Sequence, residues 1–311
     1  MKKGLILSIV CALVLCGTMS FTACGGEKNI TVVAREQGSG TREAFDKVVT
    51  DGNGNYLEMK VDGKKVYKTT ATADLQKETG NVMSKVASDK NAIGYISLGS
   101  VNETVKVVKV NGITPSAETV LNGTYAIQRP FVVMTNSSVT LTDITADFLL
   151  YLKSGASEQH ANDAGCIFLS DPAKRANAGK DPIAIETFTA KSSLPEGGKI
   201  TVNGSTSMEK FIKKAMSGYA ALYGRTADEL FTLDLQGSSV GVSAAQKDTN
   251  GNVIGLSSAA VDNAAINSFN VCLDAVAVIV NTANETVSDL TIGQLYDIYT
   301  GKITRFSEIN G

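Results

Sequence analysis

Short apolar runs alternate with amphipathic segments along most of this chain. Strand-like runs of this kind are Ile30–Val33, Ala92–Leu98, Val105–Val110, Lys199–Val202 and Leu230–Leu235. Apolar residues recur with helical spacing over 44–49 and most clearly over 208–223, where Thr206 and Glu209 also have the spacing of a capping box. Because strand and helix patterns alternate, the sequence predicts an α/β fold.

Two further apolar runs, Pro130–Asn136 and Ala275–Asn281, each end in Asn. A chain of 311 residues can bury one large core or two smaller ones, and two cores need connecting segments. These runs are therefore our candidates for strands that cross between two lobes. Turn residues favour a hairpin within 52–68, and the stretch 170–199, rich in Ala, Lys, Ser and Pro, is expected to be a linker or surface excursion.

Composition and charge narrow the classes of partner. The chain is 43% hydrophobic and 19% charged, with a formal net charge of −2, as in an ordinary globular protein. A slightly acidic protein is a poor partner for nucleic acid, and we expect none. No Cys/His spacing typical of a metal site is present, so we expect no metal and no cofactor.

Residues 1–23 have the pattern of a secretory leader. A positive start, Met1-Lys2-Lys3, precedes the apolar run Gly4–Cys16, which is too short for an ordinary membrane span. The leader ends at Phe21-Thr-Ala-Cys24, which resembles a bacterial lipobox with Phe where Leu is usual. We therefore expect lipidation of Cys24, with a plain cleaved signal peptide as the alternative. No later run of 18 apolar residues occurs.

Two cysteines, Cys166 and Cys272, lie beyond the leader and its anchor. Outside the membrane they could form a disulfide. They could equally be two isolated small apolar residues, and the sequence does not decide between these states.

Two turns rich in Gly, Ser and Thr carry the candidate chemistry. Gly38-Ser-Gly-Thr41 follows a strand-like run, with Arg35 just upstream, and Gly204-Ser-Thr-Ser207 follows a later run. Each opens an amphipathic segment, so each is expected at a helix N-terminus, where free N–H groups and the helix dipole attract anions. Arg35 can add a forked, charge-assisted pair to two anion oxygens. A plain helix N-cap is the alternative interpretation.

Five blocks of the sequence resemble the phosphate-binding subunit of bacterial phosphate ABC importers. They are Arg35–Arg42, Ala92–Gly99, Gly204–Ser207, Leu273–Asn281 and Leu295–Thr304. The resemblance implies a two-lobed α/β periplasmic-binding-protein fold of type II, with two crossing strands as its hinge. It also implies phosphate contacts from Arg35, Ser39, Gly40 and Thr41 in one lobe and from Thr206, Ser207 and Ser238 in the other. Arg42 is expected as a solvated or lobe-interface charge, and Lys302 and Arg305 as surface residues.

The order of these blocks differs from the usual order in that family, where the block like Gly204–Ser207 opens the mature protein. Joining Gly311 to Lys28 would restore the usual order, so the resemblance implies a circular permutant. One lobe is then formed by 27–125 plus 274–311, and the other by 126–273. A piece of a longer tandem protein, or two chains that exchange halves, are the alternatives.

Two positions depart from the family pattern. Family members usually carry an Asp that accepts the proton of hydrogen phosphate, and we match that position to Val253. The Arg that usually follows the next serine pair is replaced by Ala259. Without the acceptor, discrimination between phosphate and fully ionised sulfate should weaken, so the choice of oxyanion stays open.

An enzyme is the competing class. Gly237-Ser-Ser239-Val-Gly241 fits the nucleophile elbow of hydrolases, which places a catalytic His after the serine. The only histidine, His160, precedes Ser239 and lies in a polar stretch where an exposed side chain is expected. We therefore expect that this protein is not an enzyme.

The resemblance as a whole implies a monomeric protein, lipid-anchored on the extracellular face of a bacterial cytoplasmic membrane. It would capture inorganic phosphate between its lobes and deliver it to an ABC permease. ATP would be hydrolysed by a separate ATPase subunit, since no Walker A motif is present here. The alternative is a binding protein for another oxyanion, or a sensor or adhesion module that reuses the fold.

Overall fold

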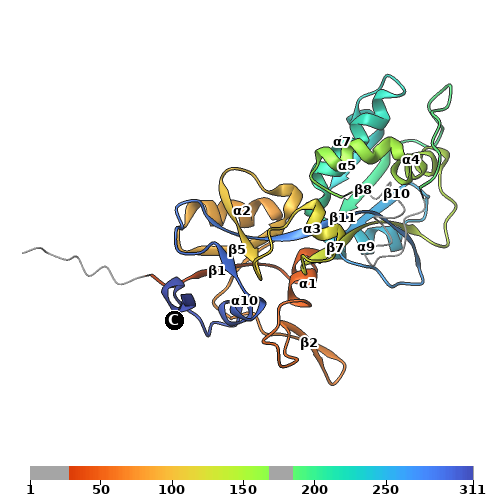
Figure 1. Ribbon diagram of the computed structural model, residues 1–311. Coiled ribbons are helices and arrows are strands. Elements are labelled where there is room, and N and C mark those ends of the chain that lie inside the picture. Colours follow the sequence, from red (N-terminus) through yellow and green to blue (C-terminus); the bar gives the residue numbers. More distant parts are fainter. Residues whose placement is uncertain (1–27, 168–184, 311) are drawn as a thin grey trace, which may run out of the picture.

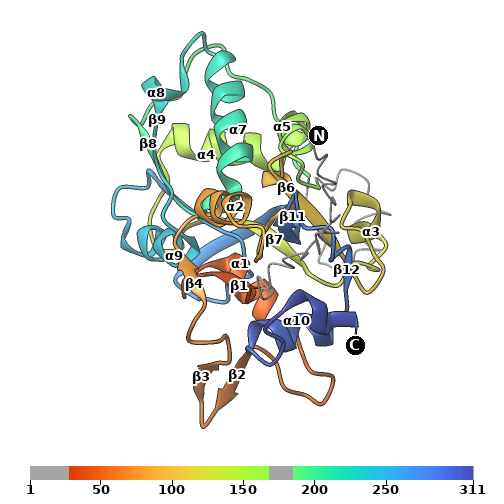
Figure 2. The same cartoon turned by 90° about the vertical axis from the view of Figure 1, so that its left-hand side faces the viewer.

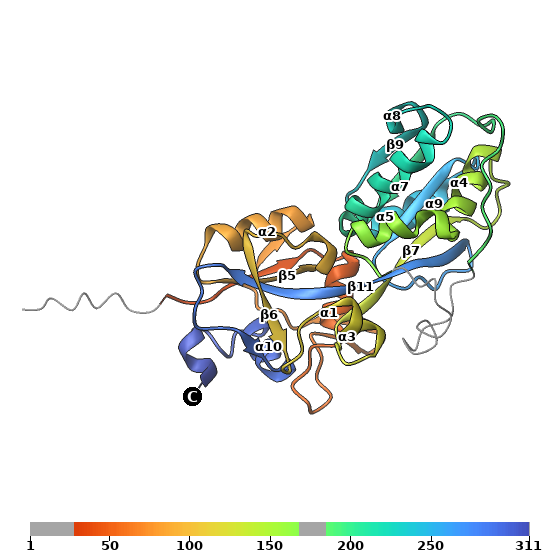
Figure 3. The ribbon, with the colours of Figure 1, turned by 45° about the horizontal axis from the view of Figure 1, so that its top comes forward.

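The computed structural model describes residues 28–167 and 185–310. The predicted leader and the predicted lipidation site Cys24 lie outside this part of the chain. Two α/β lobes are joined by the strands β7 (Gln128–Asn136) and β11 (Ile266–Asn281), which run from one lobe into the other (Figures 1 and 3). The predicted two-lobed architecture with two crossing strands is therefore confirmed.

The first lobe contains both ends of the described chain. Its elements are β1 (Thr31–Arg35), α1 (Gly40–Asp46), β4 (Asp74–Gln76), α2 (Thr79–Ser88), β5 (Ala92–Ser97), η1 (Leu98–Ser100), β6 (Val105–Val110), α3 (Ala117–Leu121), β12 (Asp289–Leu290), α10 (Ile292–Tyr299) and η4 (Phe306–Asn310). A hairpin, β2 (Glu58–Val61) with β3 (Lys64–Tyr67), projects from it (Figure 2).

The second lobe is formed by the middle of the chain. Its elements are α4 (Asp143–Lys153), η2 (Gly155–Ser157), α5 (Glu158–Asp163), β8 (Ile200–Gly204), η3 (Thr206–Met208), α7 (Glu209–Ala221), α8 (Ala227–Leu230), β9 (Phe231–Asp234), α9 (Ser238–Lys247) and β10 (Val253–Ser257). Residues 185–199, the described part of the expected surface excursion, form neither a helix nor an extended strand.

One ten-stranded sheet passes through both lobes, with the order β4-β1-β5-β11-β7-β10-β8-β9; β6 also pairs with β11, and β12 pairs with β6. The first half of β11 pairs antiparallel with β7, and its second half pairs antiparallel with β5 and β6. Strands β4, β1 and β5 are parallel, as are β9, β8 and β10. In each lobe the strands that lead to the candidate turns therefore end at the same edge of the sheet.

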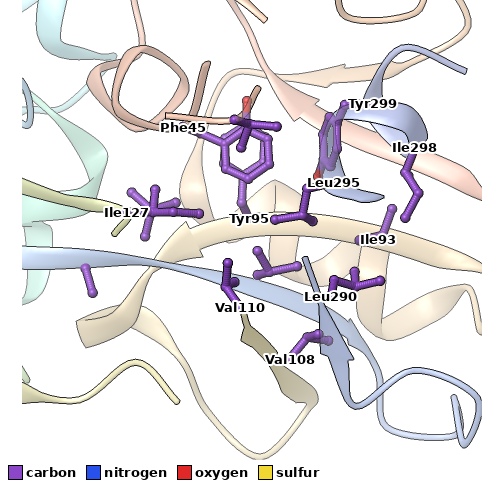
Figure 4. Close-up of a cluster of buried hydrophobic side chains, with 14 of the residues drawn as sticks. Phe45, Ile93, Tyr95, Val108, Val110, Ile127, Leu290, Leu295, Ile298 and Tyr299 are labelled. Atoms are coloured by element: carbon purple, nitrogen blue, oxygen red, sulfur yellow. The ribbon is translucent and has the colours of Figure 1, made fainter. Parts of the chain in front are cut away.

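An aromatic group fills the core of the first lobe behind the Arg35 turn. The rings of Phe45 and Tyr95 stack with their centroids 4.1 Å apart, and Tyr299 packs against both (Figure 4). The Tyr95 hydroxyl accepts a hydrogen bond of 3.2 Å from the backbone N–H of Arg35. The core thereby fixes the end of β1, where the arginine side chain leaves the sheet.

The core of the second lobe gathers the apolar faces of α4 and α7 around Phe148, Tyr219 and Phe231. Cys166 and Cys272 are both buried in this core as free thiols. Burial raises the pKa of Cys272 well above its ordinary value, and the neighbouring Cys166 adds to that shift. The structure therefore shows two buried apolar residues without a disulfide between them.

The predicted strands agree with the structure to within a few residues, except that β11 begins nine residues before the predicted Ala275. Polar residues in its first half interrupt the apolar pattern, and the pairing with β7 shifts register between Asn270 and Cys272. The predicted hairpin is confirmed as β2–β3. Its turn holds Asp62 and Gly63 at positive φ values of 52° and 76°, as expected for a tight two-residue hairpin.

Candidate functional site

The turn between β1 and α1 forms the first side of the site. Gly38, at a φ of 86°, allows the chain to reverse after β1. Ser39 is the N-cap of α1 and accepts a hydrogen bond of 3.4 Å from the Arg42 N–H. Gly40 is the first helical residue, and its N–H points away from the helix toward the second lobe, where it donates to Ser238 Oγ at 3.3 Å.

The turn after β8 forms the second side. Gly204, at a φ of 136°, lies so close to β10 that a Cβ there would be 2.2 Å from Leu256 O, so only glycine fits. Ser205 then leads into η3, which begins at Thr206 and continues into α7. A further turn places Ser238 as the first residue of α9, after Gly237 at a φ of 127°.

The two sides meet through their hydroxyl and guanidinium groups. Thr41 Oγ1 lies 2.9 Å from Ser207 Oγ, and Arg35 Nη2 donates to Thr206 Oγ1 at 3.3 Å. A backbone bond from Ser239 N to Gly38 O, 3.1 Å long, joins the turns beside them. All seven residues that the sequence nominates are buried and gathered in one cluster: Arg35, Ser39, Gly40, Thr41, Thr206, Ser207 and Ser238.

Arg35 is held by the segment between β4 and α2. Its Nε donates to Gln76 O at 3.2 Å, its Nη2 also donates to Lys77 O, and its Nη1 donates to Thr79 Oγ1 at 3.2 Å. Burial lowers the pKa of Arg35 to about 10, so the guanidinium keeps its charge at neutral pH. The site thus holds a buried cation whose nearest partners are neutral oxygens.

Two residues of this cluster were not predicted. Thr79, the first residue of α2, lies 3.2 Å from Thr206 Oγ1 and 3.3 Å from Ser207 Oγ through its own hydroxyl. Ser258 follows β10 and receives a hydrogen bond of 2.9 Å from Ser205 Oγ. The sequence offered one signal for each. Thr79 is a hydroxyl residue at the start of an amphipathic helix, and Ser258 is a hydroxyl residue directly after a strand.

Val253 is not the position that faces the site. It opens β10 and pairs with Thr201, whereas Ser258 follows the other end of that strand. Five residues of extended chain separate the two positions by about 16 Å. Matching Val253 to the usual proton acceptor was therefore wrong, and the residue that occupies the site at the end of this strand is a serine.

Two expectations about local contacts were also wrong. Arg42 is buried instead of solvated, because it pairs with Asp46 at 3.0 Å, donates to Arg35 O and lies over the ring of Tyr67. Thr206 does not act in a capping box, because its hydroxyl accepts hydrogen bonds from Arg35 and from the Thr79 N–H instead. Lys302 and Arg305 are exposed, as expected.

A buried ion pair lies behind the cluster, on the crossing strands. Arg129 of β7 is paired in register with Asp274 of β11, and its Nη2 is 2.9 Å from Asp274 Oδ2. Asp274 also accepts from Ser97 Oγ of the first lobe at 2.9 Å, while Arg129 donates to Ser258 O at 3.4 Å. Burial raises the pKa of Asp274, and the ion pair with Arg129 opposes that shift.

The hydroxyls of the second side are oriented as donors. Ser238 Oγ accepts from Gly40 N and Ser258 N, so its own proton is directed at Ser258 Oγ, 3.3 Å away. Ser258 Oγ then receives protons from Ser205 and Ser238, and its own O–H is left to donate. Among the described residues, no carboxylate is hydrogen-bonded to the seven nominated side chains or to Ser258.

The arrangement is suited to a small oxyanion. The helices α1, α2 and α9 all begin at the cluster, so the positive ends of three helix dipoles meet one buried guanidinium there. The part of the chain that the structure describes contains no group of His, Cys, Asp or Glu suited to a metal ion. None of its helices is both long and apolar enough to span a membrane.

The hydrolase alternative has no supporting contact. His160 is half-buried on α5 and not exposed, and its Nε2 lies 2.7 Å from the hydroxyl of Tyr151. Burial lowers the pKa of His160. Among the described residues its hydrogen-bond partner is Tyr151 and not Ser239, whose backbone N–H instead joins the two turns of the site.

Comparisons with known proteins agree with this geometry. The model of the PBP superfamily domain matches residues 22–155 and 189–311. The chain is 33% identical to phosphate-binding protein PstS 2 of Streptococcus pneumoniae serotype 4, over 99% of each chain. It is 30% identical to phosphate-binding protein PstS 2 of Streptococcus agalactiae serotype V over the whole of both chains.

A solved structure is similar to the fold described above. It is the phosphate-binding protein of a phosphate ABC transporter from Streptococcus pneumoniae, 32% identical in sequence. The superposition covers 90% of this chain and 99% of that one, with a TM-score of 0.63.

Proposed function

Because this chain belongs to the PBP superfamily and, within it, to the family of phosphate-binding PstS proteins, we propose that it captures inorganic phosphate between its two lobes and delivers it to an ABC importer. The observation that carries the proposal is the approach of Arg35 and Thr41 of one lobe to Thr206 and Ser207 of the other. This cluster offers one cation, several O–H donors and the first N–H groups of three helices to a single anion.

The mechanism is closure of the lobes around the anion, without covalent chemistry. Contacts such as Thr41–Ser207 join hydroxyls of opposite lobes directly, and phosphate oxygens would replace these contacts. An anion that bridges both lobes binds the closed arrangement more tightly than the open one and so shifts the population toward it. Strands β7 and β11 would be the hinge of this motion, since they connect the lobes.

The lobe boundaries and the block order belong to the same proposal. We assign 27–125 plus 274–311 to one lobe and 126–273 to the other, which the two separate apolar cores support except at Ile127, Ile167 and Leu273, which pack in the core of the first lobe. A circular permutation relative to the wider family is favoured by the hydrogen bond of 2.7 Å from Ile30 N to Thr304 O, which brings the two chain ends together. The relatives from the two streptococci share this order, because they align along their whole length.

We further propose that the protein acts as a monomer held to the extracellular face of the cytoplasmic membrane by a lipid on Cys24. Its partners would be an ABC permease and the separate ATPase subunit of that transporter. Radioactive palmitate labelling of the wild type and of Cys24→Ala in the native cell tests the anchor, and label on both proteins would contradict it.

Another oxyanion is the second candidate, because within 28–167 and 185–310 the residues of the cluster are hydrogen-bonded to no carboxylate that could accept the proton of hydrogen phosphate. Such a site has little means to reject sulfate, which differs from hydrogen phosphate mainly in lacking that proton. We therefore expect phosphate and arsenate to bind with similar affinity and sulfate to compete measurably.

Titration calorimetry of the purified protein with phosphate, arsenate and sulfate at several pH values tests the proposal. Binding of phosphate by the wild type supports it. Binding of sulfate alone would favour the second candidate, and binding of none of the three would contradict both.

A further inference from the structure

We propose that Thr79, at the first position of α2, is a third point of contact for the anion, in addition to the two turns described above. This inference rests on the proposed function and names a residue of the same site. Neither the turn chemistry nor the family resemblance nominates Thr79. Thr79 is nominated by its position in the structure.

The position of Thr79 is defined from both lobes. Only 5% of the residue is exposed, although it lies at the end of a surface helix. Its hydroxyl is within hydrogen-bond distance of three groups: Arg35 Nη1 at 3.2 Å, Thr206 Oγ1 at 3.2 Å and Ser207 Oγ at 3.3 Å. Thr79 therefore touches the cation of the first lobe and both hydroxyls of the second.

Arg35 fixes the direction of the Thr79 hydroxyl. A guanidinium only donates, so Thr79 Oγ1 accepts from Nη1 and directs its own proton away from Arg35. Thr206 Oγ1 already accepts from Arg35 Nη2 and from the backbone N–H of Thr79, so its proton is free to point at Thr79 or at an anion. The Thr79 proton then points at Ser207, on the side where an anion oxygen would lie.

The start of α2 adds backbone donors to this hydroxyl. α2 is ten residues long, and its N-cap, Glu78, makes no side-chain capping bond, so the first turn keeps N–H groups without a capping oxygen from that residue. The N–H of Thr79 already points into the cluster, at Thr206 Oγ1. The segment that holds Arg35 through Gln76 and Lys77 thus also presents a hydroxyl and a helix N-terminus to the ligand.

Calorimetry with inorganic phosphate on three variants of the full chain tests this role. Thr79→Val keeps the shape of the side chain and removes the hydroxyl, and we expect it to weaken phosphate binding by roughly tenfold or more. Thr79→Ser restores the hydroxyl and should bind within about threefold of the wild type. Thr291→Val is the matched control, because it removes a hydroxyl that caps α10 away from the site and should leave the affinity unchanged.

The outcomes separate this inference from the proposed function. If the wild type binds phosphate and Thr79→Val binds it equally well, Thr79 is not a ligand and the proposed function stands. Weak binding by both Thr79→Val and Thr79→Ser would also overturn the inference, because the hydroxyl would not be what matters. If the wild type binds no phosphate, the proposed function fails and this inference fails with it.

Discussion

The two sides of the site differ in kind. The side built on β1, β4 and α2 supplies the charge, because Arg35 is fixed by three oxygens of its own lobe before any contact with the other lobe. The side built on β8, β10 and α9 supplies hydroxyls, and one of them, Ser238, accepts from the Ser258 N–H of its own lobe at 3.1 Å and from the Gly40 N–H across the gap at 3.3 Å. The charge is therefore held by contacts of one lobe, whereas the hydroxyl of Ser238 is held by contacts from both lobes.

This difference explains how a slightly acidic chain can attract an anion. Attraction depends on one buried guanidinium and three helix N-termini and not on the net charge. The hydroxyl side adds geometric selectivity, because each O–H group donates to one oxygen of the anion. We therefore expect substitutions on the charged side to weaken phosphate binding more than substitutions on the hydroxyl side.

Loss of the charge should have the largest effect. Arg35→Ala removes at least two charge-assisted bonds, each worth about 1.5–3 kcal/mol, so phosphate affinity should fall at least about 100-fold. Calorimetry measures the change in affinity, with Arg225→Ala as control, because Arg225 is exposed and pairs with Glu229 at 3.2 Å. Equal affinity of Arg35→Ala and the wild type would show that charge at this position is dispensable.

Blocking the approach of the two sides should have the second-largest effect on phosphate affinity. A Cβ on Gly40 would lie 2.6 Å from Ser258 C and 2.7 Å from Ser238 Oγ, too close for the closed arrangement. Overpacking of this kind costs about 1–3 kcal/mol, so Gly40→Ala should weaken phosphate binding about 5- to 150-fold. Gly155→Ala is the control, since no atom lies within 4 Å of a Cβ there. Identical affinities for the two variants would mean that closure at Gly40 is not required.

Removal of one hydroxyl from the second side should have a smaller effect. Ser207→Ala loses one O–H donor to the anion, worth about 1.5 kcal/mol, so affinity should fall roughly tenfold. Ser88→Ala, an exposed serine at the end of α2, should bind as the wild type does. A loss as large as that of Arg35→Ala would contradict the division between a charged and a neutral side.

The last prediction concerns stability instead of affinity and rests on the buried carboxyl beside Arg42. Burial raises the pKa of Asp46 to about 6, and Arg42 opposes the shift. The ordinary pKa of an Asp is about 4, so Asp46 binds a proton at a higher pH in the folded state than in the unfolded state. The free energy of unfolding therefore rises as the pH falls from 6 to 4. The gain is at most about 3 kcal/mol.

Asp46→Asn cannot take up that proton, so it isolates this contribution. Denaturant unfolding at pH 4, 5, 6 and 7 should show the stability of the wild type, relative to Asp46→Asn, rising toward low pH. A difference that is constant over this range would show that Asp46 does not titrate there.

The two turns were predictable because their signals are local. Glycines and hydroxyls after a strand specify a turn and a helix start, and Arg35 lies within that segment. Thr79 and Ser258 were not predictable in the same way. Thr79 reaches the site only because β4 pairs with β1, and Ser258 only because β10 ends there, which are facts of sheet order.

Other errors came from contacts between distant segments. Arg42 has the spacing of a solvated helix position, yet Tyr67 of the β2–β3 hairpin covers it, with the guanidinium carbon 4.9 Å from the ring centroid. Val253 was matched through the resemblance of its strand to a family pattern, and the sequence of a strand does not show which of its ends faces a site. Thr206 has capping-box spacing, yet the other lobe offers its hydroxyl a charged partner.

The central claim is that the two sides enclose one tetrahedral anion. Diffraction from crystals grown with arsenate, recorded at the arsenic edge, locates the anion by its anomalous signal. The account predicts one strong peak between the Arg35 guanidinium and the hydroxyls of Thr41, Thr206 and Ser207. A peak elsewhere on the protein, with none between these side chains, would contradict it.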